Sequence, residues 1–224
     1  MPDPARSVTR PASTFKRRRR KLSPKRQAEL EEWIGRWGLD PVGPPVDLDA
    51  LFGRAAPVYL DVGFGHGEST IELARVRPDV DVIGVEVHDP GVVTVLDAVE
   101  NVPLPNVRVV HGDVLSFLDR VPAGALAGVC VFFPDPWPKP RQRHRRLIRA
   151  DVVAAFAERL RPGGELLLAT DIVDYAEQMI EACDGDGRLT GGVADPPSWR
   201  PSTRFERRGR DEGRPATDLC YRRL

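Results

Sequence analysis

Short runs of apolar residues alternate along the chain with stretches in which apolar residues recur every three or four positions. The runs predict buried β-strands, and the periodic stretches predict amphipathic helices. The predicted strands cover residues 58–62, 80–86, 107–111, 127–133 and 165–170, and the predicted helices cover residues 68–75, 91–100, 150–160 and 173–183. This alternation predicts a mostly parallel sheet with right-handed crossovers and helices on both faces.

The two ends of the chain depart from this alternation. Residues 1–28 are rich in proline and basic residues and lack apolar periodicity, so we expect a disordered arm that orders, if at all, on a partner. Residues 190–224 have few helical signals, and the apolar positions in 217–221 suit a late antiparallel strand. We therefore predict one Rossmann-like α/β domain over residues 29–224, preceded by the basic arm.

The basic residues are unevenly distributed. The 224 residues include 33 Lys and Arg and 33 Asp and Glu, and this net charge of zero by itself argues against a polyanionic partner. Residues 1–28, 137–149 and 200–224, however, hold 24 of the 33 basic residues and only 5 of the 33 acidic ones. Any single run of this kind is more often a solvated face than a binding surface. If the fold gathers the three runs, they form a phosphate-binding side.

Several classes of protein are disfavoured by composition. No stretch approaches the roughly 18 apolar residues of a membrane span, and the N-terminus lacks the apolar core of a secretory signal, so we expect a cytoplasmic protein. The three cysteines lie far apart without CxxC spacing, and the histidines are not clustered. We therefore expect neither a metal site nor a disulfide framework.

A glycine-rich turn follows the first strand of the predicted core. The sequence DVGFGHG begins at Asp61 and places glycines at Gly63, Gly65 and Gly67, where a ligand approaches the backbone near the start of a helix. This spacing differs from the GxGxxG fingerprint of dinucleotide sites, and the following Glu68 is a poor neighbour for a pyrophosphate. A cationic sulfonium suits acidic surroundings better. The turn therefore favours S-adenosylmethionine as the cofactor.

Acidic residues stand in or after three successive predicted strands. Glu86 ends the second strand and is placed to accept hydrogen bonds from two ribose hydroxyls, as acids at that position do in Rossmann-like folds. Asp113 follows the third strand and is placed to accept from an adenine amino group. Each of these two acids, like Asp61, is by itself as often a helix cap or a solvent-facing residue. Together the three favour a nucleoside pocket.

A loop stiffened by prolines follows the fourth strand. The sequence FFPDPWPK, residues 132–139, holds Asp135 at the carboxyl edge of the sheet, where α/β proteins bind ligands. The alternative is a rigid turn around a buried Trp137. The basic stretch 141–146 comes next, so we expect the phosphates of a partner close to the reaction site.

At these motifs the sequence resembles the bacterial tRNA (guanine-N7-)-methyltransferases, from Val58 onward. The matching pieces are LDVGFGHGES, IGVEVH, FFPDPWPK, RRL, ATD, YAE and RPSTRFERRG. FFPDPWPK followed by TRFE is the specific part, because many methyltransferases share the glycine loop. The resemblance implies a class I methyltransferase fold with a seven-stranded sheet, mostly parallel with an antiparallel C-terminal strand. It also implies S-adenosylmethionine as cofactor and a guanosine in the variable loop of tRNA as target.

The resemblance also assigns roles to individual residues. It implies cofactor contacts at Asp61, Glu86, Asp113 and Asp135, and substrate contacts at Lys139, Asp171, Thr203, Arg204, Phe205 and Glu206. Arg141, in the basic stretch 141–146, is predicted as a further substrate contact. The family usually has Glu where this chain has Asp61, Lys where it has Arg204, and KRH where it has PRQ at 140–142. Asp61 keeps the charge on a shorter arm, and Arg204 keeps the charge in a different geometry.

The chemistry of guanine N7 agrees with these assignments. N7 carries an in-plane lone pair and no proton, so methyl transfer needs alignment with the sulfonium more than a strong general base. The methylated base is cationic, and a carboxylate such as Asp135 stabilises that charge, which makes it the predicted catalytic residue. Asp171, at the end of the fifth strand, is a second candidate for holding the base.

Two other functions remain open at this point. Another class I methyltransferase, acting on a different RNA or on a small molecule, shares the glycine loop but need not share FFPDPWPK and TRFE. A non-catalytic RNA-binding protein that has kept the fold does not need acids at every expected position. Both a monomer and a homodimer are compatible with the sequence.

Overall fold

The computed structural model describes residues 14–15, 22–102 and 104–224, apart from the side chains of Arg204 and Phe205. The predicted disorder of the basic arm therefore falls mostly outside the described residues. Helix α1 (Pro24–Trp37) begins inside the segment that the sequence assigned to the arm. The Oγ atom of Ser23 accepts a hydrogen bond from the N–H of Arg26, and Pro24 occupies the first turn, a common pair of start signals.

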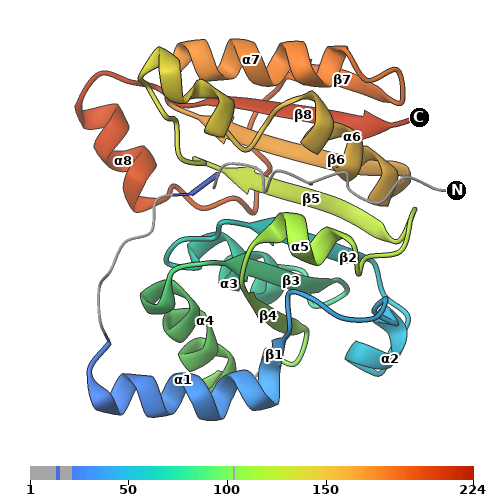
Figure 1. The fold of residues 1–224 in the computed structure, drawn as a ribbon, viewed down its shortest axis with the longest axis vertical. Coiled ribbons are helices and arrows are strands. Elements are labelled where there is room, and N and C mark those ends of the chain that lie inside the picture. Colours follow the sequence, from blue (N-terminus) through green and yellow to red (C-terminus); the bar gives the residue numbers. More distant parts are fainter. Residues whose placement is uncertain (1–13, 16–21, 103) are drawn as a thin grey trace, which may run out of the picture.

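An eight-stranded sheet runs through the molecule in the order β1-β4-β3-β2-β5-β6-β8-β7 (Figure 1). The strands are β1 (Gly38–Leu39), β2 (Val58–Val62), β3 (Asp81–Glu86), β4 (Val107–His111), β5 (Leu126–Phe132), β6 (Leu160–Thr170), β7 (Leu189–Val193) and β8 (Thr217–Arg223). Neighbouring strands are parallel except at β8, which runs antiparallel to both β6 and β7. The predicted Rossmann-like sheet with an antiparallel C-terminal strand is confirmed, and the two-residue β1 adds an eighth strand beside β4.

Helices cover both faces of the sheet. They are α1, α2 (Leu48–Phe52), α3 (Glu68–Val76), α4 (Asp89–Asn101), α5 (Val114–Leu118), the 3₁₀ helix η1 (Pro140–Arg145), α6 (Ala150–Arg159), α7 (Val173–Asp184) and α8 (Arg204–Asp211). Apolar side chains of α1, α3 and α4 form one core against the sheet, and those of α5, α6 and α7 form a second core. The sequence did not predict α2, α5 and η1, because segments of five or six residues are too short for a periodic pattern, nor α8, whose sequence RFERRGRD is mostly charged.

Strand β5 illustrates how the sheet separates the cores. Val129 and Val131 point into the core shared with α5, α6 and α7, whereas Cys130 and Phe132 point to the opposite face. There they form a small separate cluster with Leu167 and Ala169 of β6. Successive strand residues face opposite sides of a sheet, so a fully buried strand needs apolar residues at every position.

The strand order reverses between β2 and β5. From β2 the chain continues to β3 and β4 on one side, and it then returns to β5 on the other side. Loops that leave such a pair of parallel strands in opposite directions open a crevice at their carboxyl ends, which is where α/β proteins bind ligands. The glycine loop follows β2 and the FFPDPWPK loop follows β5, so both predicted motifs meet at this switch point.

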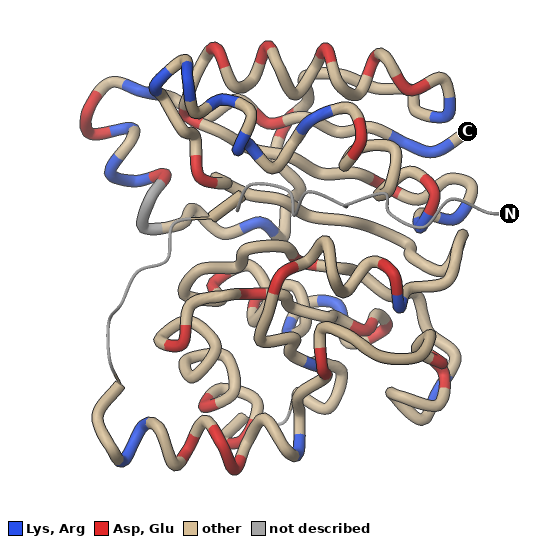
Figure 2. Tube along the Cα trace, in the orientation of Figure 1, with Lys and Arg blue, Asp and Glu red and all other residues tan. Residues whose placement is uncertain are grey.

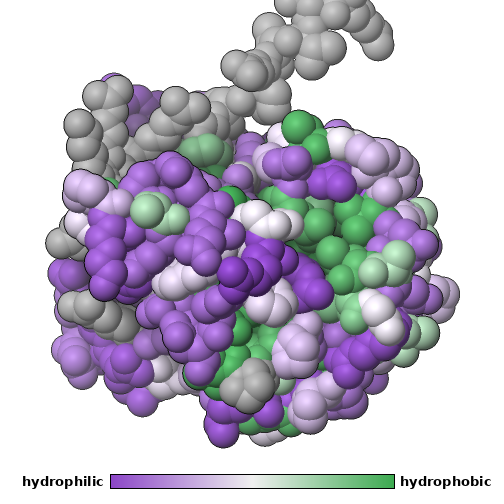
Figure 3. All heavy atoms as spheres, turned by 90° about the horizontal axis from the view of Figure 1, so that it is seen from below, coloured by the Kyte–Doolittle hydropathy of each residue, from purple (hydrophilic) through white to green (hydrophobic). Residues whose placement is uncertain are grey.

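The surface beside α1 is mostly polar. Helix α1 lies at the bottom of Figure 1, and in the view from below hydrophilic side chains cover most of the face, with hydrophobic ones in separate patches (Figure 3). Leu30 and Trp33 are the buried residues of α1.

In the described part of the chain, no helix combines the length and the apolar character that a membrane span requires.

Candidate active site

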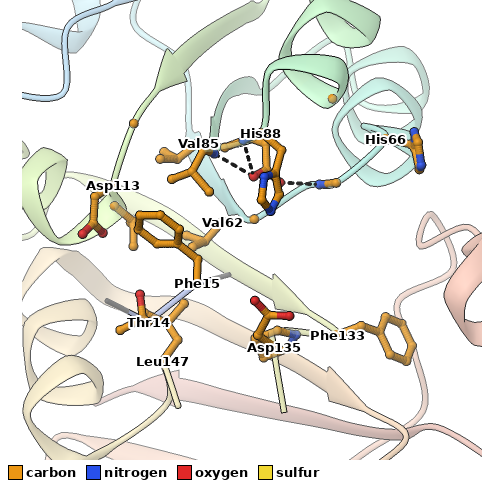
Figure 4. A pocket seen from close by; sticks show the side chains of 18 of the residues that line it. Thr14, Phe15, Val62, His66, Val85, His88, Asp113, Phe133, Asp135 and Leu147 are labelled. Carbon is orange, nitrogen blue, oxygen red and sulfur yellow. Dashed lines mark hydrogen bonds between the residues drawn. The ribbon is translucent and has the colours of Figure 1, made fainter. Parts of the chain in front are cut away.

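A cavity of about 320 Å³ opens at the carboxyl ends of β2, β3, β4 and β5. Its size is within the range of small-molecule sites, about 300 to 1,000 Å³. The lining comes from the loops after these strands and includes Gly63, Gly65, His66, Glu86, His88, Gly112, Asp113, Phe133 and Asp135. Figure 4 shows Asp113 and Asp135 reaching into this space from different strands. The structure thus brings together most of the predicted cofactor residues.

The glycine loop is shaped by contacts that a side chain would prevent. Gly67 has a φ of +81°, and a Cβ atom there would lie 2.0 Å from Cγ2 of Val95 in α4. A Cβ atom on Gly91 would lie 1.9 Å from the carbonyl oxygen of Gly65, so the start of α4 is pressed against the loop. Glycine is the residue that tolerates both conditions. Gly67 caps α3 and does not line the cavity, whereas Gly63 and Gly65 do.

Glu86 is buried and joins the end of β3 to the glycine loop. One carboxylate oxygen accepts a hydrogen bond from the N–H of Gly65 at 2.9 Å, and the other accepts from the N–H groups of Val87 at 2.6 Å and His88 at 3.0 Å (Figure 4). The oxygen bonded to Gly65 retains a lone pair for a further donor, such as a ribose hydroxyl. The sequence did not show that Glu86 also orders the loop.

Asp113 combines two roles that the sequence left as alternatives. Its Oδ1 atom accepts a hydrogen bond from the N–H of Leu115 at 3.0 Å, which makes it the N-cap of α5. The same side chain lines the cavity. The hydrogen bond that caps α5 fixes the direction of the carboxylate, so the same side chain both caps the helix and lines the cavity.

Asp61 lies behind the glycine loop and is not part of the cavity wall. The residue is 2% exposed, and its Oδ2 atom accepts hydrogen bonds from the hydroxyls of Ser69 at 2.7 Å and Thr70 at 2.6 Å in the first turn of α3. Burial raises the pKa of Asp61 to about 6, the two hydroxyls oppose this shift, and the charge of Glu86 adds to it. Asp61 anchors α3 to β2, and its predicted direct contact with the cofactor stays a prediction.

The raised pKa of Asp61 leads to a prediction about stability. Between about pH 4 and about pH 6 the folded protein binds a proton at Asp61 that the unfolded chain releases, so this residue lowers the free energy of unfolding as the pH rises. Asp61→Asn removes this titration. The free energy of unfolding of the variant relative to wild type is therefore expected to increase by about 2 to 3 kcal/mol from about pH 4 to about pH 7. Urea denaturation at several pH values measures it, and a difference independent of pH contradicts it.

The loop that carries Asp135 is fixed along its length. The N–H of Phe133 donates to the carbonyl of Ala169 at 2.8 Å and extends the pairing of β5 with β6. Trp137 is buried, and its indole N–H donates to the carbonyl of Thr14 at 3.0 Å. The guanidinium of Arg145 stacks 3.6 Å from the centre of the Trp137 ring. The expected rigid turn around Trp137 and the positioned carboxylate are therefore features of the same loop.

Arg146 holds this loop from inside the protein. Its side chain is 1% exposed, and Nε donates to the carbonyl of Pro136 at 2.8 Å. The remaining donors reach α7, at the side chains of Asp174 (2.8 Å) and Gln178 (3.0 Å). The sequence suggested that the whole stretch 141–146 faces the phosphates of a partner. Arg146 is an exception, because its donors are used inside the protein.

The predicted substrate residues lie at the carboxyl end of β6 and around it. Lys139 and Arg141 are exposed at η1, and neither has an ion-pair partner among the described residues. Asp171 accepts a hydrogen bond from Nε of Arg214 at 3.0 Å. Thr203 caps α8 by accepting from the N–H of Glu206 at 3.2 Å.

The TRFE segment, residues 203–206, begins helix α8. The side chains of Arg204 and Phe205 fall outside the described part of the chain. Glu206 is buried in an ion pair with Arg200, away from the cavity lining. Its predicted contact with substrate stays a prediction.

Two of the three basic runs converge in the fold. Arg143 in η1 pairs with Asp174 at 2.8 Å, and Arg214, which follows α8, pairs with Asp171. The two runs thus flank residues 171–174 at the end of β6, and Figure 2 shows Lys and Arg of α8 and of the segment before α6 at this end of the sheet. Arg222 and Arg223 belong to the second run but lie at the other end of β8, away from residues 171–174. The third run, residues 1–28, lies mostly outside the described residues.

The cavity also has walls that the sequence did not indicate. The ring of Phe15 lies in the cavity near Asp113 and Val62 (Figure 4), and further apolar lining comes from Val85, Val114 and Leu147. The signal for Phe15 was a single aromatic residue within the basic arm, which is too weak for a prediction. Among the described residues that line the cavity, none is a lysine or an arginine. An apolar slot edged by carboxylates suits a flat, cationic ligand.

The fold is that of methyltransferases of known structure. The aminoglycoside resistance methyltransferase NpmB1 superimposes with a TM-score of 0.57 at 20% identity, covering 80% of this chain and 92% of that one. The 16S rRNA methyltransferase KamB gives a TM-score of 0.57 at 17% identity, covering 81% and 96%. Residues 55–219 match the family model described as "Putative methyltransferase". The protein is a methyltransferase with a Rossmann-like fold.

Sequence relatives narrow this class. The tRNA (guanine-N(7)-)-methyltransferase of Alkalilimnicola ehrlichii is 45% identical over 221 residues, which cover 96% of this chain and 93% of the relative. The protein of that name from Halorhodospira halophila is 44% identical and covers 96% of each chain. The chain belongs to the tRNA (guanine-N(7)-)-methyltransferase family, which confirms the resemblance found in the sequence.

Proposed function

We propose that the protein transfers a methyl group from S-adenosylmethionine to N7 of a guanosine in the variable loop of tRNA, forming 7-methylguanosine. The observation that carries this proposal is the position of Asp135. It stands in a fixed loop after β5 and faces a cavity whose other acidic side chains, Glu86 and Asp113, come from the carboxyl ends of β3 and β4. The names of the relatives supply the target base and its carrier. We further propose that the enzyme acts in the cytoplasm.

The residues of the cavity fit S-adenosylmethionine. Glu86, Asp113 and Asp135 give the lining a negative character that suits a sulfonium and an amino group, while the apolar side chains of Val62, Val85 and Leu147 suit the flat face of an adenine ring. Glu86 would hold the ribose and Asp113 the adenine edge. When bound, the cofactor supplies an electrophilic methyl group.

The chain's own residues then have to align the target base and stabilise its new charge. Because N7 has an in-plane lone pair and no proton to lose, the protein gains most by fixing the distance and angle of approach. Asp135 accepts from the amino edge of guanine and stabilises the cation that forms. Asp171 is a second contact for the base. Apolar lining such as Val62 and Leu147 limits the access of water.

One experiment separates this proposal from its rivals. The protein is incubated with labelled S-adenosylmethionine and bulk tRNA, and the tRNA is digested to nucleosides. Labelled 7-methylguanosine supports the proposal. Label in a different nucleoside, in another RNA only, or in a small molecule indicates a methyltransferase of different specificity, and no label at all favours a non-catalytic RNA-binding protein.

The exposed basic residues of η1 give a prediction about tRNA binding. Lys139→Ala combined with Arg141→Ala is expected to weaken tRNA binding and to lower the slope of log K against log salt concentration by about 2, because each phosphate contact contributes about 1. Cofactor affinity is expected to stay the same. Filter binding at several salt concentrations measures the slope.

The matched control for this pair is Arg222→Ala. Arg222 is also an exposed arginine, but it pairs with Glu165 at the end of the β6–β8 ladder opposite Thr170, away from η1. The control is expected to leave the slope within error of wild type. Equal slopes for the η1 variant and wild type contradict phosphate contacts at these two residues.

A further inference from the structure

A buried arginine lies directly beneath the start of the loop that carries Asp135. The side chain of Arg200 is 2% exposed, although its segment connects β7 to α8 at the surface. Its guanidinium lies 5.5 Å from the ring centre of Phe132 and 5.7 Å from that of Phe133. These two rings belong to the last residue of β5 and the first residue after it. Arg200 therefore touches the point at which the chain leaves the sheet for the site.

Two carboxylates hold the guanidinium in place. Glu206 of α8 accepts from both terminal nitrogens, at 2.9 and 3.2 Å, and Oδ2 of Asp218 in β8 accepts from one of them at 2.9 Å. Nε lies 2.9 Å from Oδ1 of Asp218, an ion pair whose angles fall outside those of a hydrogen bond. Arg210 stands 3.7 Å from Glu206 and adds a second positive charge to the cluster. A buried cation is stable only when carboxylates compensate its charge, and here the carboxylates come from α8 and β8, the last two elements of the chain.

The backbone at Phe133 is in a conformation that depends on its surroundings. Phe133 has a φ of +53°, in the left-handed region that residues with a side chain rarely adopt. Such a conformation persists only where neighbouring contacts determine it, and it is common at functional sites. The N–H of Phe133 bonded to Ala169 fixes one side of the residue, and Arg200 packed on the ring fixes the other. The turn at Phe133 directs the following Pro134 and Asp135 to the cavity.

We propose that Arg200 is a positioning residue for Asp135. Glu206 and Asp218 fix the guanidinium, which packs on the rings of Phe132 and Phe133. This packing stabilises the backbone turn at Phe133 that directs Asp135 toward the base. This inference rests on the proposed function for the role of Asp135. It gives Glu206 of the TRFE motif a task different from direct contact with tRNA, because the carboxylate is engaged with Arg200 inside the protein.

The test uses Arg200→Lys, which keeps the positive charge beside Glu206 and Asp218. Lysine lacks the planar fork and does not contact two carboxylates and two rings at once. The matched control is Arg54→Lys, which changes another arginine paired with a buried carboxylate, Asp81, at the amino end of β3. Thermal denaturation of both variants shows whether they fold and how much stability each loses.

The first readout is structural and independent of the reaction. Crystal structures of wild type and Arg200→Lys are expected to show Phe133 in the left-handed region only in the wild type, with Asp135 turned away from the cavity or in several positions in the variant. An unchanged Phe133 and Asp135 in the variant overturns the proposal. Should Arg200→Lys fail to fold, Phe133→Gly takes its place, since it tolerates the same φ but removes the ring that Arg200 contacts, and the same displacement of Asp135 is expected.

The second readout is kinetic. Arg200→Lys is expected to lower kcat for methyl transfer at least tenfold, with KM for tRNA and Kd for the cofactor within twofold of wild type, while Arg54→Lys keeps the wild-type kcat. In the double variant Arg200→Lys with Asp135→Asn, kcat is expected to be no lower than in Asp135→Asn alone, because both changes remove the same carboxylate from its place. A wild-type kcat for Arg200→Lys, or a fully additive loss, overturns the proposal. Absence of methyl transfer by the wild-type protein contradicts the proposed function instead, and the crystal structures still decide about Arg200.

Discussion

Replacing Asp135 with asparagine is expected to lower kcat for guanine-N7 methylation by about 100- to 1,000-fold, the loss seen when one electrostatic partner of a transition state is removed. The side chain keeps its size, and the loop keeps its contacts through Trp137, Arg146 and Phe133. What disappears is the negative charge beside a base that becomes cationic. Steady-state kinetics with saturating tRNA and cofactor measure the change.

Two further measurements make the Asp135 prediction specific. The affinity of Asp135→Asn for tRNA is expected to stay within a few-fold of wild type, because η1 and its basic side chains are unaltered. Glu165→Gln, a charge removal on β6 next to Arg222, serves as the control and is expected to retain the wild-type kcat. Near-normal turnover by Asp135→Asn removes this residue from the mechanism.

Replacing Glu86 with alanine is expected to raise the Kd for S-adenosylmethionine about 100-fold or more. The variant loses the acceptor of the ribose hydroxyls and also the three hydrogen bonds that order the backbone at Gly65, Val87 and His88. A hydrogen bond to a charged group contributes about 1.5 to 3 kcal/mol, and about 1.4 kcal/mol corresponds to a tenfold change in affinity. Isothermal titration with S-adenosylhomocysteine measures the loss.

Glu86→Gln distinguishes the charge from the shape of the side chain. Glutamine keeps one acceptor oxygen but presents an amide NH₂ to an N–H donor of the loop, so an intermediate loss of about tenfold is expected. Circular dichroism checks that both variants fold. Wild-type affinity in both variants contradicts a cofactor role for Glu86, whereas equal losses in both indicate that the charge dominates.

Much of the site could be predicted from the sequence because its parts are local. The glycine loop, Glu86 and Asp113 stand at the ends of strands that the apolar pattern identified, and parallel strands end at the same edge of a sheet. The FFPDPWPK loop was placed by the same reasoning. The structure adds that Asp113 caps α5 and that Glu86 ties the glycine loop to β3, so two of these acids shape the pocket that they line.

Other parts of the site gave no local signal. Arg145 and Arg146 are adjacent and chemically identical, yet one stacks on Trp137 and the other is buried against α7. Asp61 reads in sequence as a pocket acid, but it lies behind the loop with the hydroxyls of Ser69 and Thr70. The direction of each side chain depends on elements packed against it from elsewhere in the chain.

The sequence by itself determined the alternation of the main strands and helices, the motifs that follow the strands, and the family, because periodicity and short motifs are properties of neighbouring residues. Only the tertiary structure decided which charges face the ligand and which are buried in support. Arg200 lies in a basic run that the sequence associates with tRNA binding. Its guanidinium is instead buried against the rings of Phe132 and Phe133, where Glu206 of α8 and Asp218 of β8 bind it. A buried charge is stable only where its partners converge, and that convergence arises when the sheet assembles.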